Sequence, residues 1–306
     1  KENDTYYMIV GNKNENQIGQ VVLCSSKNLT DWKFETILAE NSTGEIGVMW
    51  ECPDFFPLGD KHVLICSPQH MRAKGYEFHN GHNSLYFTGD YDSEKHTFEK
   101  DAPVSLDYGL DFYAPQTFQD GKDRRIIIGW MGMPDADEEY VNPTAESEGW
   151  QHCLTVPREV TYKNGMLYQY PVKELNGLRE NGTSISGSSV ELPVNGPFDL
   201  DIQVKGDQGK VSLGENLFLE YQGGDVILTL SETAGAGRKV RKAHVPSGKV
   251  ESLRILADTT AVEIYVNGGE VVFSTRYYPE TQAQAVKVEA ADVDGKIYGL
   301  KNYVME

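Results

Sequence analysis

Residues 49–58 read Met-Trp-Glu-Cys-Pro-Asp-Phe-Phe-Pro-Leu, and they place the carboxyl group of Glu51 in an aromatic and apolar neighbourhood. Burial among such side chains disfavours the charged form of a carboxyl group, which suits a group that must donate a proton near neutral pH. Phe55 and its neighbours up to Leu58 favour a β-strand, because aromatic side chains pack well on a pleated surface. This stretch therefore predicts a strand beside a candidate general acid, Glu51.

Most other segments of the chain also predict short strands that end at turns. Aromatic and β-branched residues, which favour strands, cluster in residues 6–10, 20–24, 62–67, 84–88 and 125–130. Hairpin turns are marked by Gly-Asp at 59–60, Asp-Gly at 120–121 and Asn-Gly at 164–165. No stretch of a dozen residues keeps a helical period, so we expect an all-β fold.

A second all-β unit is predicted over residues 190–306. Its clearest element is 261–273, where apolar and polar residues alternate before Asn-Gly-Gly at 267–269 reverses the chain. Residues 181–189 are rich in Ser and Gly and predict a loop. We therefore expect one domain over residues 1–175 and another over residues 190–306, joined by this segment.

The composition excludes several classes of protein. The 306 residues carry a formal net charge of −18, which disfavours binding to nucleic acid, whose phosphates attract Lys and Arg. No apolar run approaches the roughly 18 residues of a membrane helix, so no membrane partner is expected. The four cysteines show no Cys-x-x-Cys spacing, and as small buried residues they favour a cytoplasmic over a secreted protein. We expect no metal site and no cofactor.

Two further motifs accompany the stretch around Glu51. Residues 109–116 read Gly-Leu-Asp-Phe-Tyr-Ala-Pro-Gln, and residues 129–132 read Gly-Trp-Met-Gly. In this order the three segments resemble the catalytic domain of glycoside hydrolase family 32, which contains invertases, sucrose-6-phosphate hydrolases and fructan hydrolases. Residues 253–279 resemble the C-terminal β-sandwich of the same family. The resemblance covers most of the chain and implies a five-bladed β-propeller followed by a β-sandwich.

The resemblance also implies roles for individual residues. In the family the Glu-Cys pair carries the general acid/base, so Glu51 is expected to be the catalytic residue. Tyr113 is expected to hydrogen-bond near this acid/base and, like Asp111, to contact the substrate. Asp54 is a candidate for substrate binding or for hydrogen bonding at a strand end. It lies three residues after Glu51, so a regular strand would point the two side chains to opposite faces.

Two tryptophans are each open to two roles. Trp50 and Trp130 are candidates for substrate binding, where they would stack on the apolar face of a furanose ring, or they pack inside the protein. Further along the chain, Arg158 and Glu159 are adjacent and are expected to form a structural ion pair.

Two motifs of the family do not occur in the sequence: Asn-Asp-Pro-Asn, which carries the nucleophile, and Arg-Asp-Pro, which holds the substrate. We therefore expect an N-terminally truncated member whose propeller lacks its first blade, and in which a signal peptide cannot be assessed. The expected activity is retaining hydrolysis of terminal β-fructofuranosyl bonds in sucrose, sucrose-6-phosphate or fructo-oligosaccharides. Residues 1–306 alone are expected to be inactive.

A function from a different class stays open, namely a non-catalytic carbohydrate-binding fragment. The related five-bladed arabinosidases and xylosidases are a weaker alternative, because they lack the Glu-Cys-Pro-Asp string that surrounds Glu51. The oligomeric state, the length of the substrate chain and any preference for a phosphorylated substrate are left open by the sequence.

Overall fold

The computed structural model describes residues 1, 3–134 and 140–302 of the chain. Backbone contacts divide the chain into two compact units. The first unit comprises Lys1–Leu106, Tyr113–Gly129 and Asn164–Met166. The second unit comprises Asp107–Phe112, Trp130–Lys163 and Leu167–Glu306. The domain limits at residues 175 and 190 stay predictions, and each unit is described by itself.

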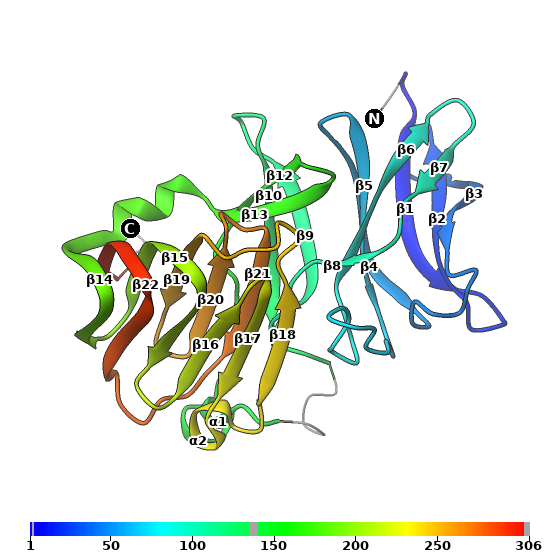
Figure 1. Cartoon of the computed structure of the whole chain (residues 1–306). Helices are drawn as coiled ribbons and strands as arrows, with labels where there is room; N and C mark the ends of the chain where they lie inside the picture. Colours follow the sequence, from blue (N-terminus) through cyan, green and yellow to red (C-terminus); the bar gives the residue numbers. More distant parts are fainter. Residues whose placement is uncertain (2, 135–139, 303–306) are drawn as a thin grey trace. The chain divides into compact units, whose positions relative to one another are not determined.

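In the described residues, the first unit consists of three groups of paired strands (Figure 1). The strands of the first sheet are β1 (Tyr6–Lys13), β2 (Gly19–Ser26) and β3 (Lys33–Glu40). The strands of the second sheet are β4 (Trp50–Leu58), β5 (Lys61–Pro68), β6 (Leu85–Asp92), β7 (Thr97–Lys100) and β8 (Val104–Ser105). The third group is β9 (Tyr113–Gln119) paired with β10 (Arg125–Met131), whose last two residues belong to the second unit. The strands predicted between residues 6 and 130 match these elements to within one residue and are confirmed.

The core of the first unit draws on both of its sheets. Val21 of β2, Leu38 of β3, Leu64 of β5 and Phe87 of β6 belong to one cluster of buried side chains. Such burial removes apolar surface from water and is the main favourable contribution to folding. The cluster thereby fixes β5 and its antiparallel neighbour β4, the strand that carries Glu51.

The second unit contains a few short elements and one large sheet. Its first elements are α1 (Pro143–Ser147), β11 (Cys153–Leu154), β12 (Arg158–Lys163), β13 (Met166–Pro171) and a 3₁₀ helix (Lys173–Leu178). The large sheet contains β14 (Arg179–Asn195), β15 (Phe198–Leu213), β16 (Leu217–Gln222), β17 (Asp225–Leu230), β18 (Val240–His244), β19 (Ser252–Ala257), β20 (Ala261–Val266), β21 (Val271–Arg276) and β22 (Ala283–Leu300). A second helix, α2 (Glu232–Gly235), connects β17 to β18.

Both α-helices are a single turn or little more, so the predicted all-β fold is confirmed. Within the described residues, no helix is long and apolar enough to cross a membrane.

The three longest strands, β14, β15 and β22, bend within the large sheet. β15 pairs with β19 along residues 198–203 and with β16 along residues 208–213. The pairing of β15 with β22 shifts between Lys205 and Gly209, and the pairing of β14 with β22 shifts after Gly187. Such bulges allow one strand to pass from one layer of a sandwich to the other. The two halves of these strands enclose the main apolar core of the second unit.

Residues 181–189 form part of β14, so the predicted loop is wrong. Most of these residues are exposed, and only Ile185 among them is buried. Gly187 has a φ of 117° at the bulge, a conformation that glycine adopts without steric cost. The Ser and Gly content therefore reflects an exposed, bulged strand rather than a flexible connection.

The hairpin predicted over residues 261–273 is confirmed as β20 and β21. Asn267 and Gly268 at its tip have φ values of 50° and 67°, as tight hairpin turns require. At Gly269 any Cβ atom would lie 1.9 Å from the carbonyl oxygen of Gln169. The Gln169 N–H donates to the carbonyl of Gly269 at 3.1 Å, so this close approach ties the hairpin to β13.

A buried arginine ties β12 to the large sheet. Arg158 is 0% exposed, and it donates to Asp107 through Nη1 and to Glu263 through Nε, both at 3.0 Å. Asp107 also accepts the backbone N–H of Ser274 at 2.8 Å. The predicted ion pair between Arg158 and Glu159 is wrong, because adjacent side chains on a strand point to opposite faces. The acidic partners come instead from segments distant in sequence.

We predict that Arg158→Met lowers the free energy of unfolding by about 3–5 kcal/mol, because it leaves the carboxylates of Asp107 and Glu263 buried without a counter-charge. Denaturant titration of the purified chain measures this loss. Lys205→Met is the matched control, since Lys205 pairs with Asp292 at an exposed site, where we expect a change within about 0.5 kcal/mol. A loss below about 1 kcal/mol for Arg158→Met contradicts the structural role given to the buried pair.

Candidate active site

The strands β4 and β9 share an unusual backbone feature. Cys52 in β4 and Ala114 in β9 each have a φ of 48°, and a proline follows each of them. Residues other than glycine rarely hold this left-handed conformation, and where they do, they often lie at functional sites. The residues that precede them, Glu51 and Tyr113, are the catalytic residue predicted from sequence and its expected neighbour. In both strands, the side chain of interest therefore directly precedes a residue in the left-handed conformation that is followed by proline.

Glu51 and Tyr113 are in direct contact. The Tyr113 hydroxyl lies 2.8 Å from Oε2 of Glu51 and 3.0 Å from the backbone carbonyl oxygen of Ser67. Tyr113 is only 2% exposed. Burial, and after it the hydrogen bond and negative charge of Glu51, raise the pKa of Tyr113 well above its usual range. The phenol therefore keeps its proton and acts as a donor.

The Tyr113 hydroxyl has one proton and two acceptors within reach, the carboxylate of Glu51 and the carbonyl oxygen of Ser67. When Glu51 is ionised, Tyr113 can donate to its carboxylate. When Glu51 carries a proton, the Tyr113 hydroxyl can turn toward the carbonyl of Ser67 and accept the proton of the carboxyl group. Tyr113 can therefore hydrogen-bond both protonation states of Glu51, as a group that alternates between acid and base requires.

Asp54 lies on the same face of β4 as Glu51. Glu51 is opposite Ser67 on β5, and Asp54 is opposite Ile65, only two residues away. The bulge inserts one extra residue into β4, so the expectation that the two carboxylates point to opposite faces is wrong. Oδ2 of Asp54 accepts the backbone N–H of Thr117 at 2.8 Å and is engaged by the Thr117 hydroxyl as well. A substrate contact of Asp54 stays a prediction.

Cys52 is exposed beside Glu51, at the centre of the bulge. Partial burial and the neighbouring charge of Glu51 raise the pKa of the Cys52 thiol. The side-chain amide of Gln116 donates to the carbonyl oxygen of Cys52 at 3.2 Å. This bond links the bulge of β4 to β9, close to the contact between Glu51 and Tyr113.

The two tryptophans lie in different environments. Trp50 has no exposed surface, and its indole N–H donates to the carbonyl oxygen of Ile46 at 2.8 Å. Trp130, in the second unit, is half-buried, and its ring meets that of His152 edge to face at 4.8 Å. Trp50 therefore occupies a packing position in this structure. Substrate contacts of Trp50 and Trp130 stay predictions.

Asp111 is fully buried in the second unit. Oδ2 accepts from Nε of Arg238 at 2.7 Å, and Oδ1 accepts from Nη2 at 2.8 Å. Oδ2 also accepts the backbone N–H of Arg276 at 2.8 Å. Both carboxylate oxygens are thus engaged by protein donors, which favours a structural role, and a substrate contact of Asp111 stays a prediction.

Sequence reasoning did not identify Ser67, Gln116 or Thr117 as partners of the site. The two strings Glu-Cys-Pro-Asp at 51–54 and Tyr-Ala-Pro-Gln at 113–116 contain a signal that could have found them. In both, a proline stands two residues after the side chain of interest. This shared spacing predicts that Glu51 and Tyr113 occupy equivalent positions on neighbouring strands. In the part of the chain that the structure describes, no three His, Cys, Asp or Glu side chains are placed to hold a metal ion.

Comparison with known proteins defines the family. The glycosyl hydrolases family 32 N-terminal domain matches residues 1–171, and the glycosyl hydrolases family 32 C-terminal domain matches residues 222–302. The chain therefore belongs to glycosyl hydrolase family 32.

Its relatives include two sucrose-6-phosphate hydrolases. The protein from Bacillus subtilis is 37% identical over 286 residues, which cover 90% of this chain and 59% of the relative. The protein from Salmonella typhimurium is 36% identical over 295 residues, which cover 93% of this chain and 60% of the relative. The chain thus spans about three fifths of the length of these curated relatives.

Solved structures show the same fold. The Bombyx mori GH32 beta-fructofuranosidase superposes with a TM-score of 0.85 and 29% identity, covering 99% of this chain and 64% of that chain. A mutant of the same enzyme, solved in complex with sucrose, gives the same values. The predicted fold class, partial β-propeller followed by a C-terminal β-sandwich, is confirmed by this similarity together with the strand content.

We predict that Glu51→Gln makes the thiol of Cys52 react faster with iodoacetamide at about pH 8, because the thiolate is the reactive form and a neighbouring negative charge disfavours it. Removing that charge lowers the pKa of Cys52. Peptide mass spectrometry measures the rate at Cys52, with the fully buried Cys66 as an unreactive internal control. An unchanged or slower rate at Cys52 contradicts the placement of an ionised Glu51 beside it.

Proposed function

We propose that this chain supplies the acid/base half of the active site of a retaining β-fructofuranosidase. The observation that carries the proposal is the contact between Glu51 and Tyr113 at 2.8 Å, on two strands that each hold a non-glycine residue in the left-handed conformation next to this contact. Membership of glycosyl hydrolase family 32 supports hydrolysis of a glycosidic bond. The names of the relatives and the sucrose complex of the Bombyx mori mutant support sucrose or sucrose-6-phosphate as the substrate. Fructo-oligosaccharides are the next candidates.

In this proposal Glu51 acts twice. In the first step its proton moves to the glycosidic oxygen while the bond from that oxygen to the anomeric carbon breaks, and a second carboxylate bonds to the anomeric carbon. In the second step the Glu51 carboxylate takes a proton from water, and the water oxygen displaces the second carboxylate with net retention. Tyr113 donates to Glu51 while it is a carboxylate and accepts from it while it is an acid.

Neither of the two candidates in residues 1–306, Asp54 and Asp111, fits the role of the second carboxylate. A retaining enzyme needs it about 5–5.5 Å from the acid/base. Asp54 is held by two donors of Thr117, and Asp111 is held by Arg238. The family's nucleophile motif, Asn-Asp-Pro-Asn, does not occur in the sequence. We infer that residues 1–306 alone do not complete the double displacement.

The assignment to domains and compartment is part of the proposal. We assign the chemistry to the predicted domain over residues 1–175 and the sandwich to residues 190–306. All four cysteines are free thiols, which supports a reducing compartment such as the cytoplasm. Carbohydrate binding without turnover is the second candidate function. It is favoured by our inference that residues 1–306 do not supply the carboxylate nucleophile.

We predict that Glu51→Gln lowers kcat/KM for sucrose by about 10²–10⁴-fold, the usual worth of general acid catalysis. The measurement uses a polypeptide in which residues 1–306 are joined to a segment that carries the Asn-Asp-Pro-Asn and Arg-Asp-Pro motifs. An aryl fructoside with a good leaving group should be affected much less, because its departure needs little protonation. Sucrose hydrolysis within about threefold of the parent means that Glu51 is not the acid.

We predict that the purified 306-residue chain releases no fructose from sucrose or inulin above background, because one carboxylate alone does not support a double displacement. Chromatography of the sugars after prolonged incubation measures the release, and the joined polypeptide described above is the positive control. Fructose release that is abolished by Glu51→Gln in the 306-residue chain would show that this chain provides its own nucleophile.

A further inference from the structure

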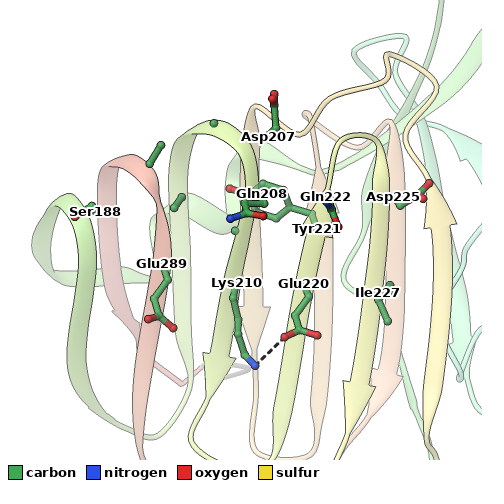
Figure 2. Close-up of a pocket in the computed structure, with 14 residues that line it drawn as sticks. Ser188, Asp207, Gln208, Lys210, Glu220, Tyr221, Gln222, Asp225, Ile227 and Glu289 are labelled. Atoms are coloured by element: carbon green, nitrogen blue, oxygen red, sulfur yellow. Dashed lines mark hydrogen bonds and ion pairs between the residues drawn. The ribbon is translucent and has the colours of Figure 1, made fainter.

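The groove on the large sheet of the second unit is a solvated and mainly polar face. It has a volume of about 760 Å³, and Figure 2 shows charged and amide side chains along it. Lys210 of β15 is opposite Glu220 of β16, and the two side chains pair at 2.8 Å while both are partly exposed. Exposed pairs of this kind contribute little, and the side chains described there indicate no ligand.

Residues 69–84, which connect β5 to β6 in the first unit, fold back on the end of β5. The backbone N–H of Met71 donates to the carbonyl oxygen of Gly81 at 2.7 Å, and that of Asn83 donates to the carbonyl oxygen of Pro68 at 3.0 Å. Met71 also belongs to the buried core of the first unit. These contacts fix the backbone on both sides of residue 82.

His82 is buried against the ring of Tyr113. It is only 8% exposed, and its imidazole meets the phenol ring at 87°, with the ring centres 6.0 Å apart. Aromatic rings favour such an edge-to-face arrangement at centre distances of about 4.5–7 Å. The imidazole also lies 5.3 Å from the ring of His70, which is exposed. His82 therefore packs on the same phenol that hydrogen-bonds to Glu51.

The contacts of Tyr113 divide between its hydroxyl and its ring. The hydroxyl lies 2.8 Å from Oε2 of Glu51 and 3.0 Å from the carbonyl oxygen of Ser67, whereas the ring meets His82. Two hydrogen bonds at one oxygen leave the ring free to pivot about that oxygen, and a side chain packed on the ring removes this freedom. Truncation of His82 would leave a cavity into which the phenol could turn.

We propose that His82 is a positioning residue for the acid/base of this enzyme, because its ring holds the Tyr113 hydroxyl between the carboxyl group of Glu51 and the carbonyl of Ser67. Functional groups need support of this kind, since a small displacement breaks a productive geometry. His82 acts through Tyr113 and is therefore not a catalytic residue. The inference rests on the proposed function, in which Tyr113 serves both protonation states of Glu51.

Crystal structures of two variants of the 306-residue chain test the positioning without any need for turnover. In His82→Ala we expect the Tyr113 hydroxyl to lie more than about 3.5 Å from Oε2 of Glu51, beyond hydrogen-bond distance. In His82→Phe, which keeps a ring at this position, the two atoms should stay within about 3.2 Å. A hydroxyl that remains bonded to Glu51 in His82→Ala overturns the proposal, and so does loss of the bond in His82→Phe.

A double-mutant cycle separates positioning from a general loss of stability. It uses the polypeptide in which residues 1–306 are joined to the two missing motifs. His82→Ala and Tyr113→Phe should each lower kcat for sucrose about tenfold, roughly the worth of a hydrogen bond to a charged group. The double variant should lose no more than Tyr113→Phe alone, because both changes remove the same contact. Losses that multiply mean that His82 acts elsewhere, which overturns the proposal.

The pH profile of kcat/KM gives a readout that a merely structural role would not move. In His82→Ala the alkaline fall should shift to higher pH by about 0.5 unit, because the ionised carboxylate of Glu51 loses a donor. His82→Phe should restore the parent profile, and His79→Ala, at an exposed histidine of the same connection, should leave it unchanged. An unshifted profile in His82→Ala contradicts the positioning role. If Glu51→Gln leaves sucrose hydrolysis intact, the proposed function fails, while the crystal structures still decide whether His82 holds Tyr113.

Discussion

The hydrogen bond between Tyr113 and Glu51 depends on two departures from regular strand geometry. In β4 and in β9 a residue other than glycine adopts a left-handed conformation directly before a proline. Proline cannot donate to a neighbouring strand, and the ladder between β4 and β5 shifts its register directly after Glu51. The side-chain amide of Gln116 donates to the carbonyl oxygen of Cys52 and thereby joins β9 to the bulge of β4. The buried core of the first unit holds β5, the strand that pairs with β4, in place.

The motif at 109–116 contributes to both units of the chain. Its first half, with Asp111, belongs to the second unit and is anchored there by Arg238, while its second half begins at Tyr113 and belongs to the first unit. The second unit contains buried ion pairs, since Arg158 pairs with Asp107 and Arg238 pairs with Asp111, all without exposed side-chain surface. Such pairs contribute little net stability, but breaking one leaves an uncompensated charge. They therefore fix which segments come together.

The sequence predicted the strands of the first unit, the hairpin of β20 and β21, and the neighbourhood of Glu51, because each rests on local patterning or on a contiguous motif. It did not predict the face of Asp54, since a bulge depends on pairing with another strand. It also paired Arg158 with its neighbour Glu159, although the acidic partners lie about fifty and a hundred residues away along the chain. The Ser- and Gly-rich segment around Gly187 was misread for a related reason, because its partner β22 lies near the end of the chain. Contacts between distant segments are what local sequence patterns do not encode.

The central claim is that Glu51 is the proton donor to the glycosidic oxygen. A crystal structure of the Glu51→Gln variant with bound sucrose tests it most directly, in a polypeptide that carries residues 1–306 together with the two missing motifs. The account predicts that the side-chain amide at position 51 lies within about 2.6–3.2 Å of the glycosidic oxygen, with the Tyr113 hydroxyl still in contact with that amide. A sucrose molecule whose glycosidic oxygen is hydrogen-bonded to a different carboxyl group, with position 51 out of reach, would contradict it.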